Sequence, residues 1–124
     1  MTQSFGKNVS LAERRKFARA NIYAITRYFC PLRDMEVGVQ TRISDISEGG
    51  VLLVTFMEGV PVGAAVRLSF VMPGEDSLYI SIEGIARHTG ILEKDLFRSG
   101  IEFEKVKKKD MLAIRQYVAL HKKK

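Results

Sequence analysis

The arginine-rich stretch near the N-terminus has the residue types and the spacing to bind an anion. It reads Glu13-Arg14-Arg15-Lys16-Phe17-Ala18-Arg19 and places three guanidinium groups within six residues. A guanidinium presents a planar fork of donors that can meet a phosphate, or the O6/N7 edge of a guanine, with two parallel hydrogen bonds. The spacing of Arg15 and Arg19 lets both contact one ligand. A charge cluster near a terminus is more often a solvated surface than a functional site, so this stretch alone does not establish a site.

A second stretch, Asp45-Ile46-Ser47-Glu48-Gly49-Gly50, has the form Asp-x-Ser-x-x-Gly and lies between two runs of β-type residues. Its carboxylate accepts hydrogen bonds, its hydroxyl both donates and accepts, and its glycines permit a tight turn or a close backbone approach. Taken alone, Asp-x-Ser is best explained as a turn that binds its own backbone. The arginine motif upstream favours a ligand site instead.

Together the two motifs resemble the PilZ domain, the bacterial receptor module for the second messenger cyclic di-GMP. Gly50-Val51-Leu52-Leu53 continues as a strand, and Gly100-Ile101-Glu102-Phe103 is similar to a late strand of the family. The resemblance covers roughly residues 13 to 103. It implies a six-stranded antiparallel β-barrel with a C-terminal α-helix.

The resemblance also implies how four of these residues bind cyclic di-GMP. Arg15 and Arg19 would contact phosphate and the Hoogsteen edge of guanine. Asp45 would accept hydrogen bonds from the guanine N1–H and N2–H groups, and Ser47 would add a hydroxyl hydrogen bond. These four residues therefore form the centre of the predicted site.

Three further residues complete the predicted ligand-binding set. Gly50 would let the backbone approach the ligand or hold the turn that aims the motif, and Gly49 would act likewise. Arg14 precedes the first motif arginine, where a basic residue in the family accompanies a stacked pair of ligands. A solvated Arg14 is the competing interpretation, so one or two ligands per chain stays open.

Length and composition predict a single soluble domain. A chain of 124 residues has room for one core, here residues 13–124, preceded by a flexible tail over residues 1–12. No apolar run approaches the roughly 20 residues needed to span a bilayer, and the N-terminus lacks an apolar signal segment. We therefore expect a cytoplasmic protein without membrane insertion. The lone Cys30 excludes an intramolecular disulfide and is expected to be a small buried hydrophobe.

The net charge of +6 and the pI near 9.6 favour an anionic partner. The positive charge is distributed in two groups. Arginines precede the first expected strand, whereas lysines gather at residues 105–109 and 122–124. Lysine is strongly hydrated and usually stays in water, whereas the arginine fork suits specific anion contacts. The arginines are therefore the predicted binding group.

Hydrophobic alternation predicts a mainly β fold. The expected strands are Asn21–Leu32, Met35–Ile46, Val51–Phe56, Ala65–Met72, Leu78–Arg87 and Leu96–Phe103. A loop is expected from Thr89 to Asp95. Asp110 is expected to be the N-cap of a helix over about 110–122, in which Met111, Ile114 and Val118 form one apolar stripe. Six strands with short turns and one terminal helix predict a closed or covered antiparallel barrel.

No catalytic or metal-binding pattern is found, so an enzyme, a metal and a cofactor are not expected. Ser47 has no evident base, and His88 and His121 lack acidic or cysteine partners at ligand spacing. In the family the strand that ends at Arg87 and His88 can approach the ligand, where Arg87 could stack on a guanine. A surface strand end is the preferred assignment for both residues.

Two other classes of protein stay open. A nucleic-acid-binding barrel is disfavoured, because the strands lack an obvious row of exposed aromatics beside the basic residues, although Tyr23, Tyr28 and Phe29 keep it possible. A PilZ-fold adaptor that binds only protein usually lacks the arginine motif.

The receptor hypothesis implies a mechanism. The segment Met1–Lys16 would move onto the barrel as Arg15 and Arg19 close over ligand held by Asp45 and Ser47. With no output domain on the chain, the altered surface would act on an unidentified downstream protein, in motility, adhesion or exopolysaccharide control as the family's roles imply.

Overall fold

The computed structural model describes residues 17–30, 38–74 and 78–122. The expected tail over residues 1–12, together with Arg14 and Arg15, lies outside the described residues, as do the predicted strand ends Leu32 and Met35. The described strands and helix are β1 (Arg19–Phe29), β2 (Val39–Ser47), β3 (Gly50–Phe56), β4 (Ala65–Val71), β5 (Tyr79–Glu93), β6 (Leu96–Lys105) and α2 (Lys108–His121).

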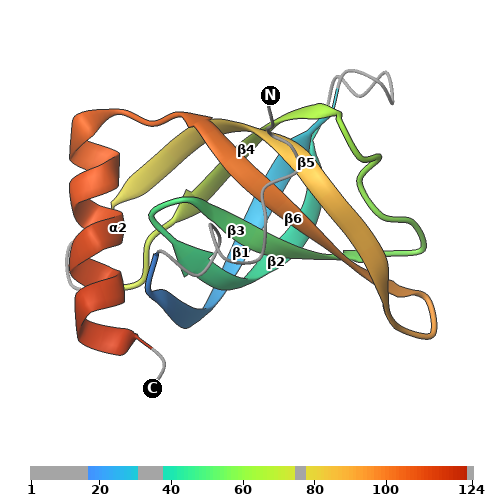
Figure 1. Cartoon of the computed structure of the whole chain (residues 1–124), viewed down its shortest axis with the longest axis horizontal. Helices are drawn as coiled ribbons and strands as arrows, with labels where there is room; N and C mark the ends of the chain where they lie inside the picture. Colours follow the sequence, from blue (N-terminus) through green and yellow to red (C-terminus); the bar gives the residue numbers. More distant parts are fainter. Residues whose placement is uncertain (1–16, 31–37, 75–77, 123–124) are drawn as a thin grey trace.

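The six strands form a closed antiparallel barrel in the order β1-β2-β3-β6-β5-β4 (Figure 1). β1 completes the closure by pairing with β2 on one side and with β4 on the other. Closure supplies every strand with two neighbours and so removes the unpaired edges that an open sheet would leave. The predicted fold class is confirmed.

Alternation of side chains fills the barrel interior. On β4, Val66, Leu68 and Phe70 are buried, and Ile80 and Ile82 on β5 face the same core. Cys30 is also fully buried among these apolar side chains, as predicted. The intervening residues of these strands form the outer wall, so the strict period of two in the sequence corresponds to one inward and one outward face.

A β-bulge interrupts the alternation of β2 beside the predicted site. Ile43 pairs with Leu53, but Asp45 pairs with Leu52, which leaves Ser44 as an extra residue on β2. An extra residue shifts the following side chains to the other face. Asp45 and its neighbour Ile46 are consequently both buried, at 7% and 1% exposure.

Strand β5 is longer than predicted. It continues to Glu93, so the expected loop from Thr89 to Asp95 is wrong over most of its length. Thr89 is held in place because its hydroxyl donates to the Val60 carbonyl at 2.5 Å and lies 2.9 Å from the Ser99 hydroxyl. These contacts let the β5–β6 hairpin extend from the end of the barrel opposite α2 (Figure 1).

Helix α2 begins at Lys108, two residues before Asp110, which was predicted to be its N-cap. Lys107 is the N-cap, with no side-chain capping bond, and Met111 N–H donates to its carbonyl at 2.9 Å. Asp110 therefore lies in the first turn and is buried, so its assignment as N-cap is wrong. The reason is that Lys108 and Lys109 are good helix formers and extend the helix N-terminally.

The apolar stripe of α2 is confirmed at two of its three positions. Ile114 and Val118 are buried, whereas Met111 is half-buried. The helix lies against β1 and β2, where the Tyr117 hydroxyl donates to the Asn21 carbonyl at 3.0 Å. This contact fixes α2 against β1.

Candidate functional site

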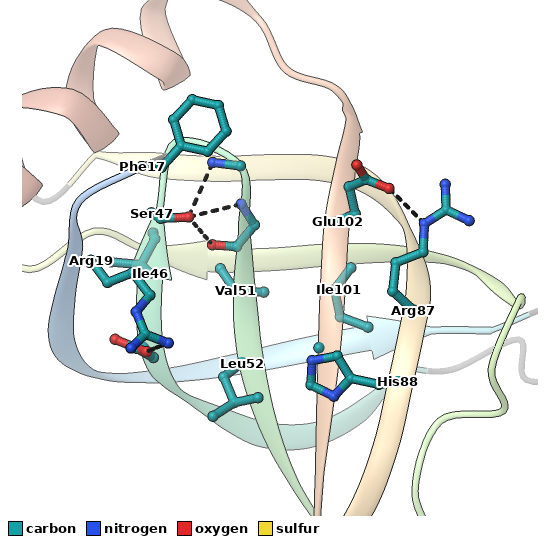
Figure 2. A pocket seen from close by; sticks show the side chains of 14 residues that line it. Phe17, Arg19, Ile46, Ser47, Val51, Leu52, Arg87, His88, Ile101 and Glu102 are labelled. Atoms are coloured by element: carbon teal, nitrogen blue, oxygen red, sulfur yellow. Dashed lines mark hydrogen bonds and ion pairs between the residues drawn. The ribbon is translucent and has the colours of Figure 1, made fainter. Parts of the chain in front are cut away.

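A cavity of about 330 Å³ opens between the β2–β3 turn and the β5–β6 ladder. Figure 2 shows side chains from these strands facing one another across it. The residues that line it are Phe17, Arg19, Asp45, Ile46, Ser47, Gly49, Gly50, Val51, Leu52, Arg87, His88, Gly100, Ile101 and Glu102.

Strand pairing brings Arg19 of the first motif to Asp45 of the second. On the β1–β2 ladder Arg19 pairs with Ser47 and Asn21 pairs with Asp45. The Arg19 Nη1 atom lies 3.5 Å from the Asp45 Oδ2 atom. The Arg19 side chain is 53% exposed and that of Asp45 only 10%, so the guanidinium reaches from the rim toward a recessed carboxylate.

Ser47 fixes the turn that follows it. Its Oγ accepts hydrogen bonds from the backbone N–H of Gly49 at 3.1 Å and of Gly50 at 3.2 Å. The hydroxyl donates in turn to the Gly50 carbonyl at 3.4 Å, and Figure 2 shows all three contacts. Ser47 thus binds the backbone of its own turn, which is the explanation that an isolated Asp-x-Ser favours.

The two glycines of the turn are required by close packing. A Cβ on Gly50 would lie 2.1 Å from the Ile101 carbonyl oxygen, and a Cβ on Gly49 would lie 2.9 Å from the Phe17 ring. Gly50 therefore allows β3 to approach β6, and Gly49 allows the Phe17 ring to lie over the turn. Their predicted role in ligand approach stays a prediction.

The opposite wall carries residues that sequence reasoning assigned to a surface strand end. The Arg87 Nε–H group donates to Glu102 Oε1 at 2.5 Å. Ala86 pairs with Ile101 and His88 with Gly100, so Arg87 is an extra residue at a bulge. These side chains face the cavity because the bulge changes the direction in which β5 presents them (Figure 2).

Gly100 makes room for the imidazole of His88. A Cβ at this position would lie 2.1 Å from His88 Nε2. Glycine inside a strand often marks such a close approach, so Gly100 is a signal in the sequence for this wall. Phe17 belongs to the arginine-rich stretch and Glu102 to the late strand of the family resemblance, but the sequence assigned neither a role in binding, although both line the cavity.

The cavity presents cations and carboxylates in pairs. Arg19 lies beside Asp45 on one wall, and Arg87 is bound to Glu102 on the other. Guanidinium groups bind anions, and carboxylates accept from N–H donors. The arrangement therefore suits a ligand that has both anionic groups and N–H donors.

The described residues contain no cluster of three or more His, Cys, Asp or Glu side chains that could hold a metal ion. Within the same residues, no helix has the length and apolar character required to cross a membrane.

Comparison with known proteins identifies a protein family for this chain. The family profile of the PilZ domain matches residues 13–120. A comparison with the sequences of curated proteins finds no significant match.

Three solved structures share the fold. Bacillus subtilis MotI/DgrA, an inhibitor of motility, is 21% identical with a TM-score of 0.73, covering 86% of this chain and 50% of that chain. The PilZ domain of Escherichia coli YcgR with c-di-GMP is 14% identical with a TM-score of 0.68, covering 87% and 91%. The MrkH–c-di-GMP complex of K. pneumonia is 16% identical with a TM-score of 0.65, covering 86% and 50%. This chain thus spans about half the length of MotI and of MrkH.

Proposed function

Since the chain belongs to the PilZ domain family, we propose that it is a receptor for cyclic di-GMP that signals to a partner protein. The observation that carries this proposal is the convergence of Arg19, Asp45 and the Ser47–Gly50 turn on one cavity. These residues belong to two motifs that are distant in the sequence, and the barrel brings them together at its rim.

The chemistry of cyclic di-GMP fits this set of side chains. Its phosphates require cations, and the guanine O6/N7 edge suits an arginine fork. The guanine N1–H and N2–H groups require an acceptor, which the recessed Asp45 carboxylate supplies. The proposed ligand-binding residues are Arg14, Arg15, Arg19, Asp45, Ser47, Gly49 and Gly50.

The size of the cavity supports a role for the preceding segment. At about 330 Å³ the cavity lies near the lower end of the range for small-molecule sites, about 300 to 1,000 Å³. We propose that Met1–Lys16 adds Arg14 and Arg15 over the bound ligand and so completes the site. Ordering this segment costs about 1 kcal/mol or more for each residue that becomes fixed, and less in total when the segment is only partly fixed. Charge-assisted hydrogen bonds must offset this cost.

Two of the similar structures support the choice of ligand, because they are a YcgR PilZ domain with c-di-GMP and a MrkH–c-di-GMP complex. MotI is an inhibitor of motility, which supports a regulatory role through another protein. For this chain the output is proposed to be a changed surface, formed when the N-terminal segment closes, that a downstream protein recognises.

Isothermal titration of cyclic di-GMP tests the proposal. The wild-type chain is compared with an Arg15→Ala/Arg19→Ala variant, with GTP and a short oligonucleotide as competing ligands. A matched control, Arg27→Ala/Arg67→Ala, removes the same charge from the outer wall, away from the cavity. We expect selective binding that is lost in the first variant and retained in the control.

The same titration gives the stoichiometry. Two ligands per chain would support the role of Arg14 with a stacked pair, and one ligand would remove it. No heat and no competition at about 100 μM, which means binding weaker than about −5.5 kcal/mol, would sink the receptor hypothesis. Equal losses in both variants would mean that only the overall charge matters.

A further inference from the structure

A stripe of exposed apolar side chains crosses the outer wall of the barrel, away from the cavity. It consists of Tyr23 and Ile25 on β1, Val71 on β4 and Tyr79 on β5, which are 71%, 51%, 47% and 60% exposed. From here on, the apolar stripe means these four residues of the barrel wall and not the buried side chains of α2. Single exposed apolar residues are normal, but a contiguous group often marks an interaction site.

Strand pairing makes the stripe contiguous. Val71 pairs directly with Tyr79 on the β4–β5 ladder. Thr26 pairs with Phe70 at the end of the β1–β4 ladder, and Ile25 and Val71 are the next residues beyond that pair. Both point outward, because Thr26 and Phe70 point into the core. The stripe therefore crosses three neighbouring strands at one level of the barrel.

Three arginines flank the stripe and are held by neighbouring groups. Arg42, which pairs with Ile25, lies 5.5 Å from the centre of the Tyr23 ring. Arg27 donates from Nη1 to the Gly38 carbonyl at 3.0 Å. These contacts restrict both guanidinium groups, and each guanidinium retains further N–H donors because it carries five.

The third arginine, Arg67, lies 4.6 Å from the centre of the Phe29 ring. Arg67 pairs across the β4–β5 ladder with Glu83. Glu83 is the acidic residue on this face of β1, β2, β4 and β5, within the part of the chain that the structure describes. Among the described residues, three guanidinium groups against one carboxylate give this face a positive charge. Tyrosine and arginine are also the residue types enriched in the energetic centres of protein interfaces.

From this arrangement we propose that the apolar stripe and its three arginines bind the partner protein, through a partner surface that has aliphatic or aromatic side chains flanked by carboxylates. The inference rests on the proposed function for the existence of a partner. It does not depend on which nucleotide occupies the cavity, because none of these residues lines it.

Charge and side-chain type favour a protein partner over a second copy of this chain and over a single-stranded nucleic acid. A second copy paired by a two-fold axis would bring together two faces of the same positive charge, which is unfavourable. A single-stranded nucleic acid would use the arginines and could stack bases on Tyr23 and Tyr79, but Ile25 and Val71 lie between these rings and interrupt the row of aromatic side chains that successive stacked bases need. An acidic protein surface with an apolar centre complements both the apolar stripe and the positive charge of the arginines.

Selection from a random peptide library displayed on phage tests the proposal on the full chain. We expect selected peptides to combine Asp or Glu with aliphatic or aromatic residues. Their affinity should fall at least about tenfold for an Ile25→Asp/Val71→Asp variant. A matched control, Phe56→Asp/Ile91→Asp, makes the same change at exposed positions near the β5–β6 hairpin and should leave the affinity unchanged.

Peptides that bind the stripe variant as tightly as the wild type, or that lack acidic residues, would overturn the proposal. So would a short single-stranded oligonucleotide that displaces the peptides, because it would assign the face to nucleic acid. Titration of cyclic di-GMP into the same variants keeps the two hypotheses apart. A wild-type chain that binds peptides through the stripe but not cyclic di-GMP would reject the receptor function alone.

Discussion

Arg115 of α2 donates from Nε to Oε1 of Glu48 at 2.8 Å, and this ion pair joins the C-terminal helix to the turn that carries Ser47, Gly49 and Gly50. Glu48 occupies a variable position of the Asp-x-Ser-x-x-Gly motif, so the motif assigned it no role. The contact gives the helix a direct connection to the wall of the proposed site.

A double-mutant cycle with Glu48→Gln and Arg115→Gln measures the strength of this pair. The side chains are 35% and 59% exposed, so solvent screens the attraction. We expect a coupling free energy of about 0.2 to 1 kcal/mol from urea unfolding. A coupling above about 2 kcal/mol would mean that the pair behaves as a buried one, in conflict with its exposure.

Alanine at three glycines should separate backbone crowding from side-chain crowding. Gly50→Ala places a Cβ 2.1 Å from a backbone carbonyl, which cannot move without disturbing the β3–β6 ladder. Gly100→Ala meets the His88 ring instead, which can rotate. Gly90→Ala meets nothing within 4 Å and is the control.

We expect unfolding measurements to place Gly50→Ala as the most destabilised of the three, by about 1 to 3 kcal/mol or more. Gly100→Ala should cost less, and Gly90→Ala should be close to the wild type. An equal loss for Gly50→Ala and Gly90→Ala would contradict the close approach of β3 and β6.

Ser99 should be a stabilising buried hydroxyl. It is fully buried, accepts from the Val60 N–H at 3.0 Å and lies 2.9 Å from the Thr89 hydroxyl. Ser99→Ala would leave that N–H without its partner, at a cost of about 1 to 3 kcal/mol in unfolding free energy. Ser81→Ala, at a half-buried position, serves as the comparison, and equal effects of the two changes would argue against the network.

The parts of the fold that the sequence predicts are those with strict periodicity. Val66, Leu68 and Phe70 alternate with polar or exposed residues, and the strand they predict is observed nearly to its ends. Periodicity fails where a bulge inserts a residue. The alternation of β2 places Asp45 on the same face as Ile43 and predicts an exposed Ile46. Ile46 is buried beside Asp45 instead, because of an extra residue that is visible only in the pairing with β3.

The site was predicted in part for a related reason. Arg19 and Asp45 were identified by motif, and they do lie together. Arg87 and His88 were assigned to a surface strand end because their orientation depends on the β5 bulge and on the space above Gly100. Both features are relationships between strands, and a single segment of sequence does not contain them.

Tyr117 should make stability depend on alkaline pH. Partial burial raises the pKa of its hydroxyl above 10.0 by disfavouring the charged form. Above pH 10 the unfolded chain then releases this proton before the folded chain does, so the free energy of unfolding falls as pH rises. The stability difference between the wild type and Tyr117→Phe should therefore be greatest below pH 10 and shrink above it. A difference that widens with rising pH would contradict this assignment.

Arg19→Lys tests whether the site needs a guanidinium fork or only a positive charge. Lysine keeps the charge beside Asp45 but cannot make two parallel hydrogen bonds to a phosphate or a guanine edge. We expect calorimetric affinity for cyclic di-GMP to fall by about tenfold or more, which corresponds to about 1.4 kcal/mol. Thermal stability should change little, because the Arg19 side chain is 53% exposed.

The matched control for this change is Arg27→Lys on the outer wall, which should leave the affinity for cyclic di-GMP unchanged. Lysine at position 19 that binds as tightly as arginine would show that charge alone is recognised. In that case Arg19 would act as a general electrostatic attractor, and the specificity of the site would have to come from Asp45 and the residues that approach the ligand from the opposite wall.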